Sequence, residues 1–258
     1  MTTLRAGWVI TQRDLAHWVR EPWTPIFGLL FTAMLLLVFG FLFGGAITVP
    51  GGGDYIDFLL PGMLALSMMF GVETTATAMA TDARRGITDR FRSLPIGSAS
   101  VALGRVGADM VNSVAELFML IVGGLLIGWE IGNGPASAAL AVLLLLMLRF
   151  AMLWIGIFIG LSFRGAGATT AVQVLVWPIG FLSSAIVSAE TMPAWLGAVA
   201  EWNPLSATAS ATRHLFGNPS GVTEVSAAGA VWPAVIWPVV LTAIFVPLSA
   251  RAYRRLRA

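Results

Sequence analysis

The segment that decides the fold is residues 138–163, AALAVLLLLMLRFAMLWIGIFIGLSF, in which Arg149 is the only charged side chain. A helix needs about 20 mostly apolar residues to cross the hydrocarbon core of a bilayer. This segment is longer than that, and it has no polar face that water could solvate. It therefore predicts a membrane-spanning helix.

The whole chain has the composition of an integral membrane protein. Of its 258 residues, 57% are hydrophobic and 11% are charged, whereas soluble domains carry about 25% charged residues. A soluble protein this apolar could not cover its own surface. Cysteine is absent, which excludes disulfides and thiol chemistry. The formal net charge of +2 gives no reason to expect a nucleic-acid partner.

Other apolar segments lie before and after this one, separated by short polar stretches. We predict an all-α fold in a single transmembrane domain, residues 1–258. Its six spans are expected near residues 24–46, 56–80, 106–129, 138–163, 165–189 and 225–250. Glycines in these spans, such as Gly123, Gly124, Gly156 and Gly160, are candidates for close helix contacts.

The arginines give an independent test of the span count. Cytoplasmic flanks of membrane helices collect basic residues. With six spans, every arginine except Arg149 and Arg213 falls on the side of the two termini. The sequence therefore predicts that both termini are cytoplasmic.

The N-terminal segment, residues 1–22, has the pattern of an amphipathic helix. Leu4, Trp8, Leu15 and Trp18 share one stripe, while the charged residues lie elsewhere. This pattern favours an interfacial helix lying on the cytoplasmic leaflet. A frayed polar lead is the alternative.

The loop between the second and third predicted spans is the largest polar stretch on the cytoplasmic side. Within it, Ile87, Phe91 and Leu94 recur at helical spacing, and Pro95 ends the pattern. A short helix with one apolar face either rests on lipid head groups or fits a groove of a partner. The residues alone leave both possibilities open.

The external segment before the last span, residues 190–224, is longer than a simple connection needs. Met192, Trp195, Leu196, Val199 and Trp202 share a helical face, and Asn203-Pro204 breaks it before a second helical run. Two short helices with a break favour a re-entrant hairpin, a backbone form that membranes tolerate where protein or water covers it. A pair of helices lying on the surface is the alternative.

The sequence lacks the residues of the common catalytic sites. A phosphate-binding Walker loop needs a lysine, and all basic residues here are arginines. His17 and His214 fall on opposite sides of the membrane, so they cannot share a metal or an acid–base site. We therefore expect no enzyme activity, no metal and no cofactor bound by this chain.

Three charged residues lie within the predicted spans. Glu116 and Arg149 are both expected near the bilayer midplane on adjacent spans, where mutual pairing would lower the cost of burial. Their pairing could fix helix packing or contact a substrate. Glu73 lies nearer the cytoplasmic end, where it could line a water-filled cavity or extend toward the interface.

The chain resembles the permease subunits of type-2 ABC exporters of the daunorubicin-resistance and nodulation-factor types. Four segments carry the resemblance, in the family's order: residues 13–31, RDLAHWVREPWTPIFGLLF; residues 54–69, DYIDFLLPGMLALSMM; residues 84–110, RRGITDRFRSLPIGSASVALGRVGADM; and residues 192–215, MPAWLGAVAEWNPLSATASATRHL. They correspond to the interfacial helix and first span, the start of the second span, the coupling-helix loop and the external segment.

The resemblance implies roles for two sets of residues. Those expected to couple to an ATPase are Arg84, Arg85, Gly86, Ile87, Asp89, Arg90, Phe91, Leu94 and Pro95. Those expected in an extracytoplasmic gate are Pro193, Trp195, Trp202, Asn203 and Pro204. Where the family often has an acidic-basic-acidic cluster, this chain has Asp82-Ala83-Arg84-Arg85, so individual charge contacts with the ATPase are not carried over.

The resemblance also implies an assembly and a function. It predicts two cytoplasmic ABC ATPase subunits, which bind ATP and Mg, and a second permease chain in a bacterial inner membrane. The expected function is ATP-driven export of an amphiphilic drug or lipid-like substrate by alternating access. Export of a polysaccharide or lipo-oligosaccharide, secondary transport and a purely structural membrane role are the alternatives.

Overall fold

In the computed structural model, the described residues are 3–20, 23–42, 47, 49, 52–84, 98–163, 166–219 and 229–255. Within these ranges every regular element is helical, as the sequence predicts. The α-helices are α1 (Thr3–Arg20), α2 (Trp23–Leu37), α3 (Tyr55–Met69), α4 (Gly71–Arg84), α6 (Ser98–Leu126), α7 (Gly134–Ser162), α8 (Ala166–Phe181), α9 (Ala194–Glu201), α10 (Pro204–Phe216) and α12 (Val231–Arg255). A π-helical turn, η1 (Val38–Leu42), continues α2, and a 3-10 turn, η2 (Ala189–Thr191), precedes α9.

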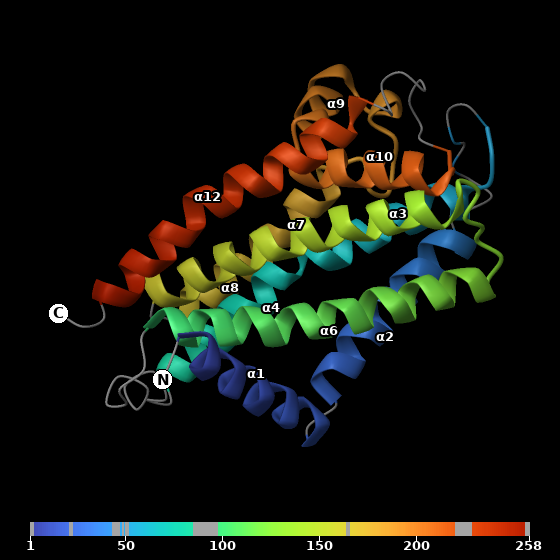
Figure 1. Cartoon of the computed structure of the whole chain (residues 1–258). Helices are drawn as coiled ribbons and strands as arrows, with labels where there is room; N and C mark the ends of the chain where they lie inside the picture. Colours follow the sequence, from blue (N-terminus) through green and yellow to red (C-terminus); the bar gives the residue numbers. More distant parts are fainter. Residues whose placement is uncertain are drawn as a thin grey trace.

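The long helices form one elongated bundle. Figure 1 shows α3, α4, α6, α7 and α12 running along a common direction, with α9 and α10 at one end and the beginning of α1 and the end of α12 at the other. The α3–α4 segment is at the centre, because it packs against α7, α8 and α10 and has most of its side chains buried. By contrast, α12 lies on the outside and packs mainly against α7.

Four helical segments in the described part of the chain are long and apolar enough to cross a membrane: Tyr55–Asp82, Val101–Leu126, Gly134–Ser162 and Val231–Arg254. They coincide with the second, third, fourth and sixth predicted spans. At the positions of the first and fifth predicted spans, the apolar helices are shorter, Ile26–Leu42 and Thr170–Phe181. The expected positions of all six apolar segments therefore correspond to helices. The fifth helix, α8, ends at Phe181, before the predicted end at residue 189, and residues 43–46 at the end of the first predicted span lie outside the described residues.

The second predicted span is an interrupted helix. α3 ends at Met69, Phe70 forms a turn, and α4 begins at Gly71. The Phe70 ring packs on the Trp177 ring of α8, with 4.8 Å between the ring centroids. The predicted second span, residues 56–80, lies within the apolar helical segment Tyr55–Asp82. The turn at Phe70 inside it was not predicted, because neither Phe nor Gly alone signals a turn in an apolar run.

Two glycines of α7 allow it to lie directly against α4. A Cβ atom at Gly156 would be 2.7 Å from the Val72 carbonyl oxygen, and one at Gly160 would be 2.7 Å from the Met79 Cβ atom. Close approach through small residues is the usual way in which membrane helices pack. The candidate contacts at these two positions are thus present, whereas a Cβ at Gly123 would meet no atom within 4 Å.

The predicted N-terminal amphipathic helix is present as α1, and it is docked on protein along one side. The Thr11 hydroxyl donates to the Gly104 carbonyl of α6 at 2.9 Å. A Cβ at Gly104 would be 2.6 Å from the Ile10 Cβ atom, so the two helices are in close contact. Trp8 points away from this contact and is 59% exposed. One side of α1 therefore packs on α6 while another remains free.

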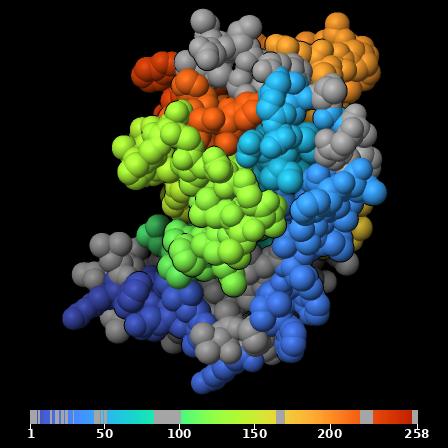
Figure 2. Space-filling model, turned by 90° about the vertical axis from the view of Figure 1, so that its right-hand side faces the viewer, coloured from blue at the N-terminus to red at the C-terminus, as the bar shows by residue number. Residues whose placement is uncertain are grey.

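An apolar surface lies along α2 and α6. Figure 2 shows this side of the molecule, with the blue atoms of α2 beside the green atoms of α6. Large exposed side chains on these two helices include Phe27, Leu30, Phe41, Leu42, Val114, Phe118, Met119 and Leu126. Contiguous exposed apolar surface of this extent marks contact with a membrane or another protein.

The packing of α7 on α4 can be tested with one pair of substitutions. Gly156→Val adds a branched side chain where the Val72 carbonyl already limits space, so it should destabilise the protein by about 1–3 kcal/mol. Gly123→Val makes the same chemical change where there is room. The measurement is thermal unfolding of both purified variants in one detergent. Equal melting temperatures would contradict the observed contact.

Candidate functional site

The three predicted intramembrane charges come from three helices of the central bundle. Arg149 lies in the middle of α7 and is 4% exposed. Glu116 lies in α6 and is partly exposed, and Glu73 lies in the first turn of α4. The N–H group of Glu73 donates to the Phe70 carbonyl at 3.1 Å.

Arg149 packs against the break between α3 and α4. Its Nη1 atom donates to the Ser67 carbonyl at 3.3 Å, and that carbonyl lies in the last turn of α3, where intrahelical acceptors lack partners. Its Nε atom is buried without a hydrogen bond. A Cβ at Gly71 would be 2.6 Å from this Nε atom. Gly71 therefore provides the space in which the guanidinium lies.

Glu116 and Arg149 lie on helices that pack against each other, as predicted. Their predicted pairing is not seen among the described residues, where the hydrogen bond of Arg149 is made to the Ser67 carbonyl.

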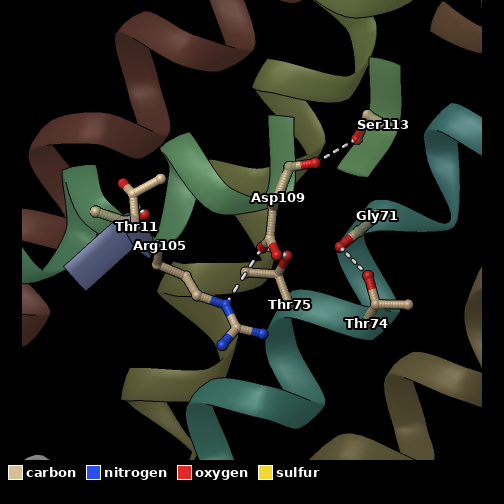
Figure 3. Close-up of polar contacts among 8 residues, drawn as sticks. Thr11, Gly71, Thr74, Thr75, Arg105, Asp109 and Ser113 are labelled. Atoms are coloured by element: carbon tan, nitrogen blue, oxygen red, sulfur yellow. Dashed lines mark hydrogen bonds and ion pairs between the residues drawn. The ribbon is translucent and has the colours of Figure 1, made fainter. Parts of the chain in front are cut away.

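A second buried carboxylate, Asp109, lies in the first half of α6 and has two polar partners. Figure 3 shows Thr75 and Arg105 converging on Asp109. Asp109 Oδ2 accepts a hydrogen bond from the Thr75 hydroxyl at 2.8 Å and lies 3.4 Å from Arg105 Nε. The spacing of Arg105 and Asp109 on one helix, four residues apart, could have predicted their ion pair. The contact with Thr75 of α4 depends on tertiary structure.

Arg213, the one arginine on the predicted external side, is the most completely buried charge described. Its relative exposure is 0%, and it lies in α10. Its Nε atom donates to the Phe58 carbonyl and its Nη2 atom to the Ala185 carbonyl, both at 2.7 Å. The guanidinium carbon also lies 3.6 Å from the centroid of the Phe58 ring. Arg213 therefore links α10 to α3 and to the turn after α8.

The turn that follows α8, residues 182–188, is buried and held against α3. The Tyr55 hydroxyl donates to the Ile186 carbonyl at 3.0 Å, next to the carbonyl that Arg213 binds. A Cβ at Gly62 would lie on the Ala185 carbonyl oxygen, so only glycine permits this contact. The Ser206 hydroxyl of α10 accepts the Ser184 N–H at 2.9 Å. The non-helical backbone of this turn thus has protein partners, as membrane burial requires.

The C-terminal end of α10 is attached to the connection between α6 and α7. The Gly132 N–H donates to the Phe216 carbonyl at 2.8 Å, and the Asn133 side chain donates to the His214 carbonyl at 2.8 Å. The Trp129 indole donates to the Asn218 side chain at 2.9 Å. Both ends of α10 are therefore fixed to neighbouring elements by hydrogen bonds.

The residues predicted to form an external gate lie around α9. The Asn203 side chain accepts the Leu205 N–H and donates to the Ile179 and Leu182 carbonyls, each at 2.9 Å. It thereby caps α10 and joins it to the end of α8. Pro193 precedes α9 and Pro204 begins α10, while Trp195 and Trp202 point outward, at 72% and 77% exposure. The two tryptophans lie on the surface and not in the bundle.

The residues predicted to couple to an ATPase are not described, with the exception of the Arg84 backbone. α4 ends at Arg84 and α6 begins at Ser98, so the predicted apolar stripe of Ile87, Phe91 and Leu94 lies outside the described residues. The assignment of Arg85, Gly86, Asp89, Arg90 and Pro95 to the same contact stays a prediction.

Comparison with known proteins identifies the family. Residues 5–216 match the family model described as ABC-2 type transporter, which is most of the chain. The chain belongs to the ABC-2 type transporter family. It is 30% identical over 226 residues to the daunorubicin resistance ABC transporter permease protein DrrB1 of Streptomyces coeruleorubidus, covering 87% of this chain and 77% of that protein.

Two further relatives are transport permeases by name. The chain is 26% identical over 218 residues to ycf38 of Cyanophora paradoxa, covering 82% of this chain and 74% of that protein. It is 25% identical over 217 residues to ycf38 of Pyropia yezoensis, covering 81% and 72%. The match confirms the expected membership in this family, whose permeases are transport components. The long apolar helices of the described residues confirm the multi-pass membrane character.

The role of Arg213 in this ABC-2 permease can be tested by Arg213→Met, which keeps apolar bulk but removes the donors. Hydrogen bonds from a charged group contribute about 1.5–3 kcal/mol each, and relief of the buried charge offsets part of that loss. We expect a net destabilisation of about 2 kcal/mol, or a melting temperature lower by about 4–8 °C. Arg251→Met, at an exposed arginine of α12, is the control. An unchanged melting temperature in Arg213→Met would show that the link is dispensable.

Proposed function

We propose that this chain is the permease subunit of an ATP-driven exporter that moves an amphiphilic drug or lipid-like substrate out of a bacterial cell. The observation that carries the proposal is the match of most of the chain to the ABC-2 family, together with its likeness to a daunorubicin-resistance permease. A separate ATPase in two copies, which binds ATP and Mg, would supply the energy. A second permease chain would complete the pathway.

We propose six membrane crossings with both termini in the cytoplasm. α2 with η1 runs from the end of the bundle where α1 lies toward the end where α3 begins (Figure 1). Its 15 and 5 residues together would span about 30 Å at 1.5 Å per residue. α8 is shorter, but the chain must pass from the end of α7 to the start of α12, which lie at opposite ends of the bundle. The buried turn after α8 would complete that crossing.

The distribution of charge supports the same orientation. Arg105, Arg251 and Arg254 flank helix ends on the side where α1 lies, as expected for a cytoplasmic surface. Arg213 is the exception on the opposite side, and its complete burial gives it a structural role that is independent of topology. The exposed tryptophans of α9 suit the outer membrane interface, where indole rings are favoured.

The crossings can be tested with cysteines, because the native chain has none. Asp54→Cys and Glu201→Cys, at exposed positions on the proposed outer side, should react with an impermeant thiol reagent in intact cells. Arg251→Cys, exposed at the inner end of α12, should react only after lysis. Labelling is read by gel mobility. Reaction of Arg251→Cys in intact cells, or protection of Glu201→Cys, would contradict this topology.

Coupling to the ATPase is proposed to occur through the cytoplasmic loop between α4 and α6. Both helix ends flanking the loop lie at the proposed inner end of the bundle (Figure 1). The first half of α6 is also where α1 docks and where the Thr75 hydroxyl donates to Asp109. A displacement of the loop would therefore move α6 together with α1 and α4. The external segment from Pro193 to Pro204 would act as the gate for release.

Phe91→Ala tests this coupling. Buried aromatic anchors of an interface cost roughly 2 kcal/mol or more when truncated, which corresponds to about a 30-fold loss of affinity. The variant should insert normally but lose both copurification of the ATPase and export. Ser93→Ala, in the same loop but outside the apolar stripe, is the matched control. If Phe91→Ala binds the ATPase and transports as well as wild type does, the loop helix rests on lipid and does not couple.

A further inference from the structure

One side of α1 carries all three arginines of the helix and faces away from the rest of the protein. Arg5, Arg13 and Arg20 are exposed, and successive members are about two helical turns apart, which places them on one side of the helix. The residues that contact α6 lie on another side and are buried: Gly7, Ile10 and Thr11. Asp14 is the one acidic residue within α1. The exposed side of α1 is therefore basic.

Two exposed apolar side chains lie among these arginines. Trp8 and Val9 are 59% and 55% exposed, and they follow Arg5 by three and four positions, so they are its neighbours on the helix surface. With the arginines they form a set that we call the α1 surface: Arg5, Trp8, Val9, Arg13 and Arg20. Basic side chains next to an exposed indole are typical of helices at a membrane interface, where the ring lies at the level of the lipid head groups.

The α1 surface leads into helix α2, whose beginning is exposed and apolar. α1 ends at Arg20 and α2 begins at Trp23 (Figure 1). The side chains of Trp23, Ile26 and Phe27 are 66%, 44% and 62% exposed. Exposed apolar side chains in a group of this kind mark contact with a membrane or another protein. A ligand suited to both helices must be negatively charged where it meets α1 and apolar where it meets α2.

An anionic phospholipid has both features. Its head group carries a net negative charge that guanidinium groups bind, and its acyl chains cover apolar side chains. A zwitterionic phospholipid brings a positive group of its own, which the arginines repel. We propose that the α1 surface binds the head groups of anionic phospholipids in preference to zwitterionic ones. Because α1 is held against α6 by the contact of Thr11 with Gly104, head groups bound there anchor the first half of α6 at the membrane surface.

The experiment places a fluorophore on the α1 surface and compares two quenching lipids. Val9→Cys, in a chain without native cysteine, is labelled with a thiol-reactive dye, and the full-length permease is reconstituted in phosphatidylcholine nanodiscs. A small fraction of the lipid is replaced by phosphatidylglycerol or by phosphatidylcholine, each carrying the same spin label on the same acyl carbon near the head group. We expect phosphatidylglycerol to be preferred near the dye by about fivefold or more, because one basic residue at an anionic lipid surface contributes about that factor.

Substitutions separate the arginines of α1 from other basic residues. The double variant Arg5→Gln, Arg20→Gln should lose most of the preference at the α1 reporter, as should salt at about 1 M, which screens exposed charges. The matched double variant Arg251→Gln, Arg254→Gln removes two exposed arginines of α12 and should leave the preference unchanged. A second reporter, Phe118→Cys, lies on the exposed apolar surface of α6 and should be quenched equally by both lipids.

Three results would overturn the proposal. Equal quenching at Val9→Cys would show that the α1 surface meets the membrane without selecting a head group. No quenching there, while Phe118→Cys is quenched, would show that this surface lies away from lipid and is available to a protein partner. A preference that survives the loss of Arg5 and Arg20 would mean that other groups select the lipid. Both leaflets contain the quencher and no ATPase is added, so the outcome is independent of the proposed topology and exporter function.

Discussion

The structure depends on one constraint, which is that buried polar groups in this apolar protein rely on the protein itself for the partners they have. Arg213 shows it most clearly. The side chain is completely buried and binds two main-chain carbonyls, Phe58 of α3 and Ala185 of the turn after α8. The charge is stabilised by these carbonyl dipoles and by the face of the Phe58 ring. The position of α10 follows from these contacts.

The same constraint explains where the backbone can leave the helical state. The turn of residues 182–188 exposes peptide groups that no helix satisfies, and it is covered by α3 and α10. Gly62 lets the turn approach, and Tyr55 and Arg213 bind its carbonyls. At the break around Phe70, Arg149 has the corresponding role, since it binds the Ser67 carbonyl of the last turn of α3. In both places an arginine and a glycine act together.

Sequence reasoning located the apolar segments and the family, because hydrophobic runs and arginine flanks are local signals. It also placed Glu116 and Arg149 on adjacent helices. It missed the break at Phe70 and the shortness of α8, because both are determined by what packs against them. It treated Arg213 as a topological exception, and only the fold shows that Phe58 and Ala185, 155 and 28 positions away in sequence, supply its acceptors. Neither contact has a pattern that a single sequence reveals.

The two buried arginines show how far the protein meets this constraint. Arg213 makes two short hydrogen bonds of 2.7 Å, and its third nitrogen, Nη1, is buried without a partner. Arg149 makes one hydrogen bond of 3.3 Å, and its Nε atom is likewise buried without a partner. In both cases the acceptors are main-chain carbonyls, so the position of each arginine and the backbone around it depend on each other.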